Sequence, residues 1–142
     1  MAIRMGKHTT NYRNTLIAAA EDAGAERGTI PPHREESPSI AYRTWAMIAD
    51  APYRYTSDDV IFTVWADRRG APEPDREVAR AEFFSKGQAC LRASDLGKKY
   101  GWGIHSDEEG RVALYGMESG EYRRLLDDPD VAKTKAMKRS RS

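Results

Sequence analysis

The clearest hydrophobic periodicity begins after Ser39. Ala41, Trp45 and Ile48 recur at spacings of four and three residues, so they would share one face of a helix. The Ser39 hydroxyl can cap the first turn, and Pro52 restricts the residue before it and stops the helix. The pattern therefore predicts an amphipathic helix between Ser39 and Pro52.

The segment 60–65 has a different pattern. Its six residues, Val-Ile-Phe-Thr-Val-Trp, are all β-branched or aromatic, which favours a strand. Alternate positions would carry apolar side chains on both faces, as in a strand from the interior of a sheet. We therefore expect a buried strand over 60–65.

Three more short helices are predicted in the C-terminal half, each followed by a stop signal. Gly87 and Gly101 follow the first two, and Pro129 follows the third. Serine side chains can cap the second and the third helix. These helices are expected at 77–86, at 95–100 after Ser94, and from Ser119 to the residue before Pro129.

Two strands joined by a loop at residues 108–110 are predicted to form a hairpin. The positions of the apolar residues decide how the two strands pair. A four-residue loop would place Ile104 opposite Ala113, whereas a three-residue loop places Ile104 opposite Leu114 and unites the apolar side chains. The shorter loop also puts Gly110 where a left-handed residue is needed. It sends three residues together to the opposite face of the sheet: His105, Ala113 and Tyr115.

Residues 12–22 give conflicting signals. Three consecutive alanines favour a helix, but the segment is short and Gly24 closes it early. Two connectors, 24–39 and 67–75, are rich in glycine, proline and charged residues and are long for loops within a domain.

The length of 142 residues suits one domain, and the composition places it among globular proteins. No apolar run approaches the roughly 18 residues of a membrane span, and the first residues lack the apolar region of a signal peptide. The single cysteine, Cys90, excludes an internal disulfide and any multi-cysteine metal site. We therefore expect a cytoplasmic protein that does not interact with a membrane.

Charge separates the end of the chain from the rest. The formal net charge is only +1, but the segment Lys133–Ser142 holds five basic and no acidic residues. Such a segment can bind phosphates and so nucleic acid, although a solvated terminus is the commoner explanation. We expect a single α+β domain over 1–132 and a basic C-terminal tail over 133–142, whose deletion would leave the melting temperature nearly unchanged.

Residues able to bind or react are concentrated between 84 and 107. They combine cationic, aromatic and titratable side chains, which suit a site for a small ligand or a partner protein. This non-enzymatic binding module is our first hypothesis. The candidate binding residues are Lys86, Cys90, Arg92, Trp102 and His105.

A small enzyme is the alternative, with Cys90 as nucleophile and His105 as its base. A free cysteine is more often a buried apolar residue, so we expect an unreactive thiol. No His, Cys or carboxylate spacing indicates a metal site, and no motif indicates a cofactor.

Three segments, 8–12, 52–62 and 83–107, resemble a family of short bacterial proteins classed as a domain of unknown function. The most specific part is Lys-Lys-Tyr-Gly-Trp-Gly-Ile-His-Ser-Asp at 98–107. The resemblance covers nearly the whole chain and implies a strand within 12–22 and an α+β cytosolic domain. It assigns no activity, substrate, cofactor or functional residue.

With a strand within 12–22, the order of elements is strand, helix, strand, helix, short helix, hairpin and helix. This order predicts a single α+β domain with a mainly antiparallel sheet packed with three to four short helices.

The proposed hairpin register gives a first testable prediction. If Gly110 adopts a positive φ, the variant Gly110→Val should be destabilised by ~1 kcal/mol or more, because a β-branched side chain resists that conformation. Urea unfolding of the two proteins measures the difference. A neutral substitution would contradict the three-residue loop.

Overall fold

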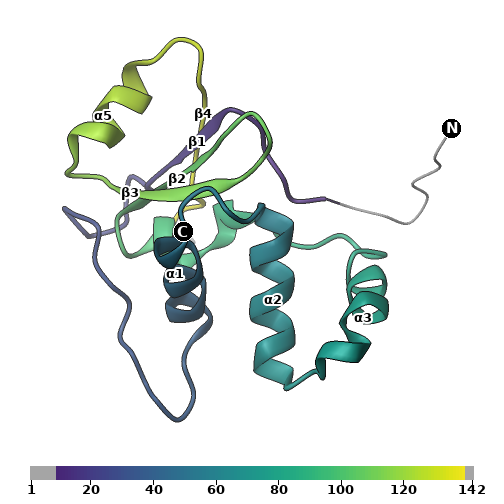
Figure 1. The fold of residues 1–142 in the computed structure, drawn as a ribbon. Helices are drawn as coiled ribbons and strands as arrows, with labels where there is room; N and C mark the ends of the chain where they lie inside the picture. The colour runs from purple at the N-terminus through teal and green to yellow at the C-terminus, as the bar shows by residue number, and fades with distance from the viewer. Residues whose placement is uncertain (1–8, 140–142) are drawn as a thin grey trace, which may run out of the picture.

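The computed structural model describes residues 9–139, in which a four-stranded sheet pairs the first strand of the chain with the last (Figure 1). Its strands are β1 (Thr15–Ala18), β2 (Trp102–Ser106), β3 (Val112–Gly116) and β4 (Ala132–Lys135). They lie in the order β3-β2-β1-β4. The pairs β1–β2 and β2–β3 are antiparallel and β1–β4 is parallel, so the predicted α+β fold with a mainly antiparallel sheet is confirmed.

Helices make up most of the remaining regular structure. Two short 3₁₀ helices, at Glu73–Asp75 and Leu91–Ala93, join the longer elements. The α-helices are α1 (Ile40–Asp50), α2 (Ser57–Arg69), α3 (Arg76–Phe83), α4 (Asp95–Lys98) and α5 (Gly120–Asp127). Within the described residues, no helix is long and apolar enough to cross a membrane.

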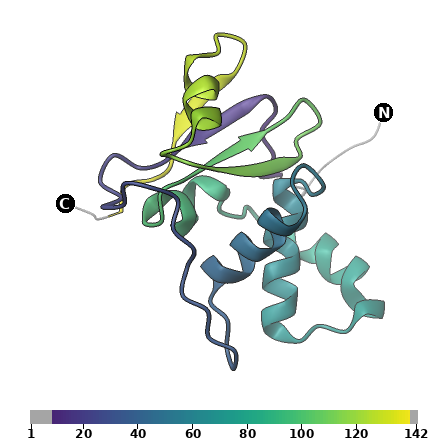
Figure 2. The ribbon, with the colours of Figure 1, turned by 60° about the vertical axis from the view of Figure 1, so that its left-hand side comes forward.

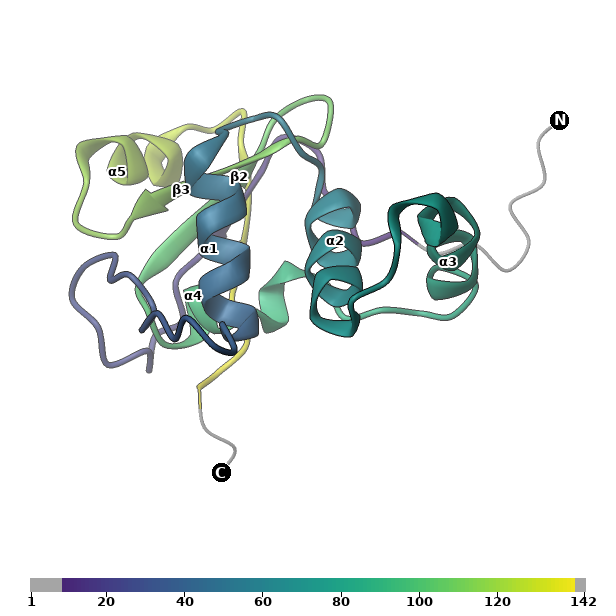
Figure 3. The same cartoon turned by 60° about the horizontal axis from the view of Figure 1, so that its bottom comes forward.

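The sheet is covered on both faces. Ile17 and Ile104 point toward α1 and α2, where they join Ile48 and Val60 in the main hydrophobic core. The opposite face lies against α5, seen on the other side of the sheet in Figure 2. Helix α3 packs against α2 and lies away from the sheet (Figure 3).

The three predicted serine caps are confirmed, whereas the helix expected over 95–100 ends at Lys98. Ser39, Ser94 and Ser119 each accept a hydrogen bond from a backbone N–H of the first turn, at 3.1 Å, and so cap α1, α4 and α5. The helix expected over 77–86 is α3, which ends at Phe83.

The strand predicted over 60–65 is wrong, because these residues belong to α2. Thr56 and Asp59 form a reciprocal capping box that starts the helix, and Gly70 ends it in the left-handed conformation. Apolar residues occur on more than one side because α2 lies between two clusters. Val60 and Val64 pack into the main core, whereas Phe62 and Ala66 pack toward α3.

The predicted strand within 12–22 and the hairpin register are both confirmed. All four residues of β1 are buried, and Ile104 pairs with Leu114. Gly110 has a φ of +83°, as the three-residue loop requires.

The expectation of a solvated C-terminal tail is corrected by the structure. Residues 132–135 form β4, Ala136 is only 5% exposed, and its N–H donates to the Ala18 carbonyl at 2.8 Å. Arg92 adds a hydrogen bond to the Lys135 carbonyl at 2.7 Å. The folded unit therefore continues past residue 132. The last three residues of the expected tail lie outside the described part of the chain.

Deleting 133–142 should consequently destabilise the protein. The deletion removes the strand that covers one edge of β1 and exposes the site where Ala136 is buried against Gly97. The melting temperature should fall by more than about 4 °C, the shift produced by a loss of about 1 kcal/mol in a domain of this size. The matched control is Lys138→Gln, which removes an exposed charge but no strand residue. An unchanged melting temperature of the deletion variant would show that β4 adds nothing to stability.

Candidate functional site

A cavity of about 250 Å³ lies between α1, α2 and the segment 83–94. Its walls are mainly apolar and include Ile61 and Val64 from α2 and Leu91 from the neighbouring 3₁₀ helix. The rings of Trp65 and Phe83 also line it, with their centroids 4.9 Å apart and a tilt of 45°. The cavity can therefore accommodate a small apolar or aromatic group.

Several polar residues of the cavity wall already have hydrogen-bond partners. Thr44 donates to the Ile40 carbonyl and Gln88 donates to the Phe83 carbonyl, each at 2.7 Å. Ser94 accepts the capping hydrogen bond of α4. The remaining polar lining residues are Arg68 and Cys90.

Arg68 is the cation of this cavity. It lies exposed in the last turn of α2, and no hydrogen bond or ion pair is found for its side chain within residues 9–139. Other arginines nearby are engaged: Arg76 pairs with Asp67 at 2.9 Å, and Arg69 lies over the Trp65 ring at 4.6 Å. No acidic residue of the described part of the chain lines the cavity, so the Arg68 charge is available to an anion.

Cys90 is half-buried in the cavity wall. Its Sγ lies 3.7 Å from the Tyr12 hydroxyl, which is its hydrogen-bond partner. Burial, followed by this contact with Cys90, raises the pKa of Tyr12 above its ordinary value, although Arg92 acts in the opposite direction. Tyr12 is therefore protonated at neutral pH and gives Cys90 no basic partner.

The structure does not bring all five predicted site residues together, although Cys90 and Arg92 both interact with Tyr12. Of these, Cys90 lines the cavity, whereas Lys86 is exposed beyond the end of α3. Arg92 binds the Lys135 carbonyl and helps to hold β4. Trp102 donates to the Thr29 carbonyl at 2.8 Å and so fixes the long loop before α1.

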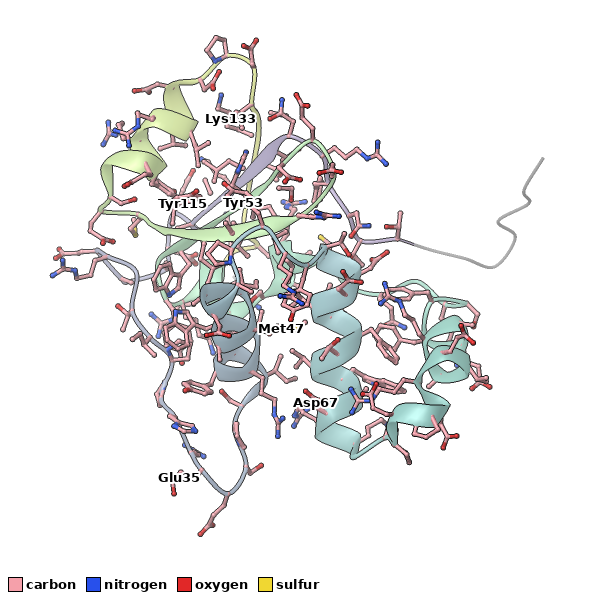
Figure 4. All side chains as sticks on the ribbon, viewed as in Figure 1. Glu35, Met47, Tyr53, Asp67, Tyr115 and Lys133 are labelled. Carbon is pink, nitrogen blue, oxygen red and sulfur yellow. The ribbon has the colours of Figure 1, made fainter. Side chains whose placement is uncertain are left out.

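His105 lies on the opposite face of the sheet from the main core, as its place next to Ile104 in β2 requires. Its Nδ1 is 2.7 Å from the Tyr53 hydroxyl, and that hydroxyl is 2.9 Å from the hydroxyl of Tyr115 (Figure 4). Tyr53 reaches this position from the loop after α1 with a φ of +60°, a conformation that non-glycine residues seldom adopt. The three side chains form a connected polar cluster.

The structure therefore forms no Cys90–His105 pair. Cys90 contacts Tyr12 on the side of the sheet that holds α1 and α2, and His105 contacts Tyr53 on the α5 side. A cysteine nucleophile and its base must be within hydrogen-bond reach of each other. Among residues 9–139, no three His, Cys, Asp or Glu side chains gather as a metal-binding group.

The most informative cavity residues, Trp65 and Arg68, were missed in the sequence. Trp65 was assigned to a strand and Arg68 to a connector, which separated them from Cys90. The Thr56–Asp59 capping signature was visible and could have placed both in one helix.

A family model described as a family of unknown function, DUF6157, matches residues 7–142. The chain belongs to this family. No curated protein and no solved structure matches it. The resemblance to a domain of unknown function is thus confirmed, and membership of DUF6157 assigns no activity to the cavity or to the tyrosine–histidine cluster.

The burial of His105 predicts a pH dependence of stability. Burial lowers the pKa of His105 below its ordinary value of 6.5, although Asp107 and Asp128 partly oppose this effect. Its Nε2 is buried without a hydrogen-bond partner in the described chain, so the charged imidazolium would hold a buried N–H with nothing to accept its hydrogen bond. Because the folded-state pKa is depressed, the unfolded state binds the proton first as the pH falls. The contribution of neutral His105 is complete above about pH 6.5 and is lost progressively below it.

The free energy of unfolding, measured with urea between pH 5 and 8, tests this prediction. The wild-type protein should lose stability below about pH 6.5, and His105→Gln should lose less over the same range. Exposed His33 provides the control, because His33→Gln should keep the wild-type slope. Parallel profiles for wild type and His105→Gln would contradict the prediction.

Proposed function

We propose that the protein is a non-enzymatic binding module whose cavity beside Cys90 takes a small, largely apolar molecule carrying an anionic group. The observation that carries the proposal is an apolar cavity with aromatic walls and one cation, Arg68, that has no protein partner among residues 9–139. Its volume of about 250 Å³ is slightly below the usual range of ligand sites, which favours a small ligand.

The side chains around the cavity suggest two parts of the ligand. Trp65, Phe83 and Ile61 offer contacts to a ring or a short hydrocarbon body. The Arg68 guanidinium can donate two parallel hydrogen bonds to a carboxylate at the cavity entrance. Since no lining residue is acidic, an anionic group would meet no charge of its own sign on the cavity wall.

The contacts of Cys90 support binding rather than catalysis. A catalytic thiol is normally activated by a histidine, a nearby cation or a helix N-terminus. The partner of Cys90 is Tyr12, whose pKa is raised, and Arg92, which acts on Tyr12, also donates its Nε hydrogen to the Lys135 carbonyl. We infer a thiol that is not activated for catalysis and that contributes contact area. A cytoplasmic location belongs to the same proposal, because a single free cysteine suits a reducing compartment.

The basic C-terminal segment gives less support to a nucleic-acid-binding function. Lys135 pairs with Glu21, and the Lys133 ammonium donates to the Asp128 carbonyl. These contacts engage part of the positive charge within the fold, and no aromatic side chain lies in Lys133–Ser142 to stack on bases.

Calorimetric titration with 2-naphthoate tests the proposal. The ring should occupy the apolar part of the cavity and the carboxylate should meet Arg68. Arg68→Gln should weaken binding about fivefold, which corresponds to the ~1 kcal/mol of an exposed ion pair. The neutral analogue 2-naphthalenemethanol should bind wild type and Arg68→Gln equally. Arg123→Gln, an exposed arginine change on α5, should leave the affinity unchanged.

A second variant tests the cavity itself. Ala93 lines it, so Ala93→Phe should fill part of the space and weaken binding of both compounds at least tenfold. The melting temperature of this variant shows whether it is folded. The proposal is wrong if 2-naphthoate does not bind at millimolar concentration, or if folded Ala93→Phe binds as tightly as the wild-type protein.

A further inference from the structure

A second hollow lies on another side of α1 and shares no residue with the cavity beside Cys90. It is an open depression of about 720 Å³ between the helix and the segment that follows it. The rings of Tyr42, Trp45 and Tyr55 line it, together with Met47. We call it the aromatic hollow.

Two rings of the hollow, those of Tyr42 and Trp45, are tilted against each other. Tyr42 and Trp45 are one turn apart on α1, with centroids separated by 5.7 Å and planes tilted by 42°. His33 stacks on Tyr42 at 4.2 Å and 7°, which fixes that ring from the preceding loop. Tyr55 contributes the third ring from the segment after the helix, where it packs against the main core.

The described residues that line the aromatic hollow carry one negative charge and no positive charge. Asp50, the last residue of α1, is its only charged lining residue, and no ion pair is found for its carboxylate in the described chain. The last turn of α1 contains no basic residue. The C-terminus of a helix carries a partial negative charge, so Asp50 adds to a negative potential instead of compensating it. A bound cation would be attracted both by the Asp50 carboxylate and by the negative C-terminal end of α1.

One ring of the hollow already has a cation beside it. The guanidinium of Arg54 lies over the Tyr55 ring, 5.8 Å from its centroid. The faces of tyrosine and tryptophan rings are negative because of the ring quadrupole, and they attract a cation most strongly when its hydration is weak. Arg54 is exposed and is not part of the hollow lining.

We infer that the aromatic hollow is a binding site for a small N-methylated ammonium compound. The methyl groups would contact the rings of Tyr42, Trp45 and Tyr55, and the positive charge would face Asp50. Sodium or an unsubstituted ammonium ion is a poorer ligand, because ring faces do not replace its strong hydration. This site is independent of the anion-binding function proposed for the cavity beside Cys90.

Nuclear magnetic resonance titration of the full-length protein with choline chloride tests the inference. Saturable shifts are expected for the Trp45 indole N–H and for the backbone amides of Met47 and Tyr55. The comparison compound is 3,3-dimethylbutan-1-ol, which has the shape of choline without its charge. It should bind at least tenfold more weakly. Sodium chloride at matched ionic strength should produce no saturable shift at these residues.

Variants then separate the charge from the rings. Asp50→Asn should weaken choline binding about fivefold, whereas Asp127→Asn, an exposed change on α5, should have no effect. Tyr42→Leu should weaken choline binding more than Asp50→Asn does. Its melting temperature shows whether the variant is folded. Equal binding of choline and its neutral analogue, an unchanged affinity of Asp50→Asn, or shifts confined to other residues would overturn the inference.

Discussion

Pairing of β1 with neighbours on both sides is the interaction on which the rest of the structure depends. The strand is only Thr15–Ala18, and its residues are at most 7% exposed. It pairs antiparallel with β2 and parallel with β4, so it joins the β2–β3 hairpin to the last strand of the chain. Its alternating side chains then divide the molecule: Ile17 packs into the main core, whereas Leu16 approaches the side on which Tyr122 of α5 lies. A short strand with both edges paired can therefore organise a chain that has few large aliphatic residues.

This division explains why the residues predicted to form one functional site lie on different faces of the sheet. Neighbouring residues of β2 point to opposite faces, so His105 lies with Tyr53 and Tyr115, while Ile104 lies with the helices that enclose the Cys90 cavity. Nearness in sequence between 84 and 107 was consequently a poor guide to nearness in space. The cavity instead combines residues from α1, α2 and the segment after α3, with Arg68 supplying its charge.

Predictions that rested on local physical signals agree with the structure. Serine caps placed three helices, and the alternation of apolar residues fixed the pairing of Ile104 with Leu114. Predictions that needed the surroundings of a segment failed. Apolar residues on both sides of 60–65 resemble an interior strand, but α2 is apolar there because α3 covers its outer side. Strand β4, Ala-Lys-Thr-Lys, has no large apolar residue at all, so its position depends on backbone pairing with β1 and no periodicity could reveal it. The error over α2 also hid Trp65 and Arg68 from the predicted site.

The central functional claim is that the cavity beside Cys90 is a ligand site in the folded protein. Cys90 is the only cysteine, so its rate of alkylation by iodoacetamide reports on that cavity alone. The measurement compares this rate with and without saturating 2-naphthoate, and repeats it for Ala93→Phe. The account predicts that 2-naphthoate slows alkylation of the wild-type protein severalfold and has no effect on Ala93→Phe. An alkylation rate of native protein that saturating 2-naphthoate leaves unchanged would contradict it.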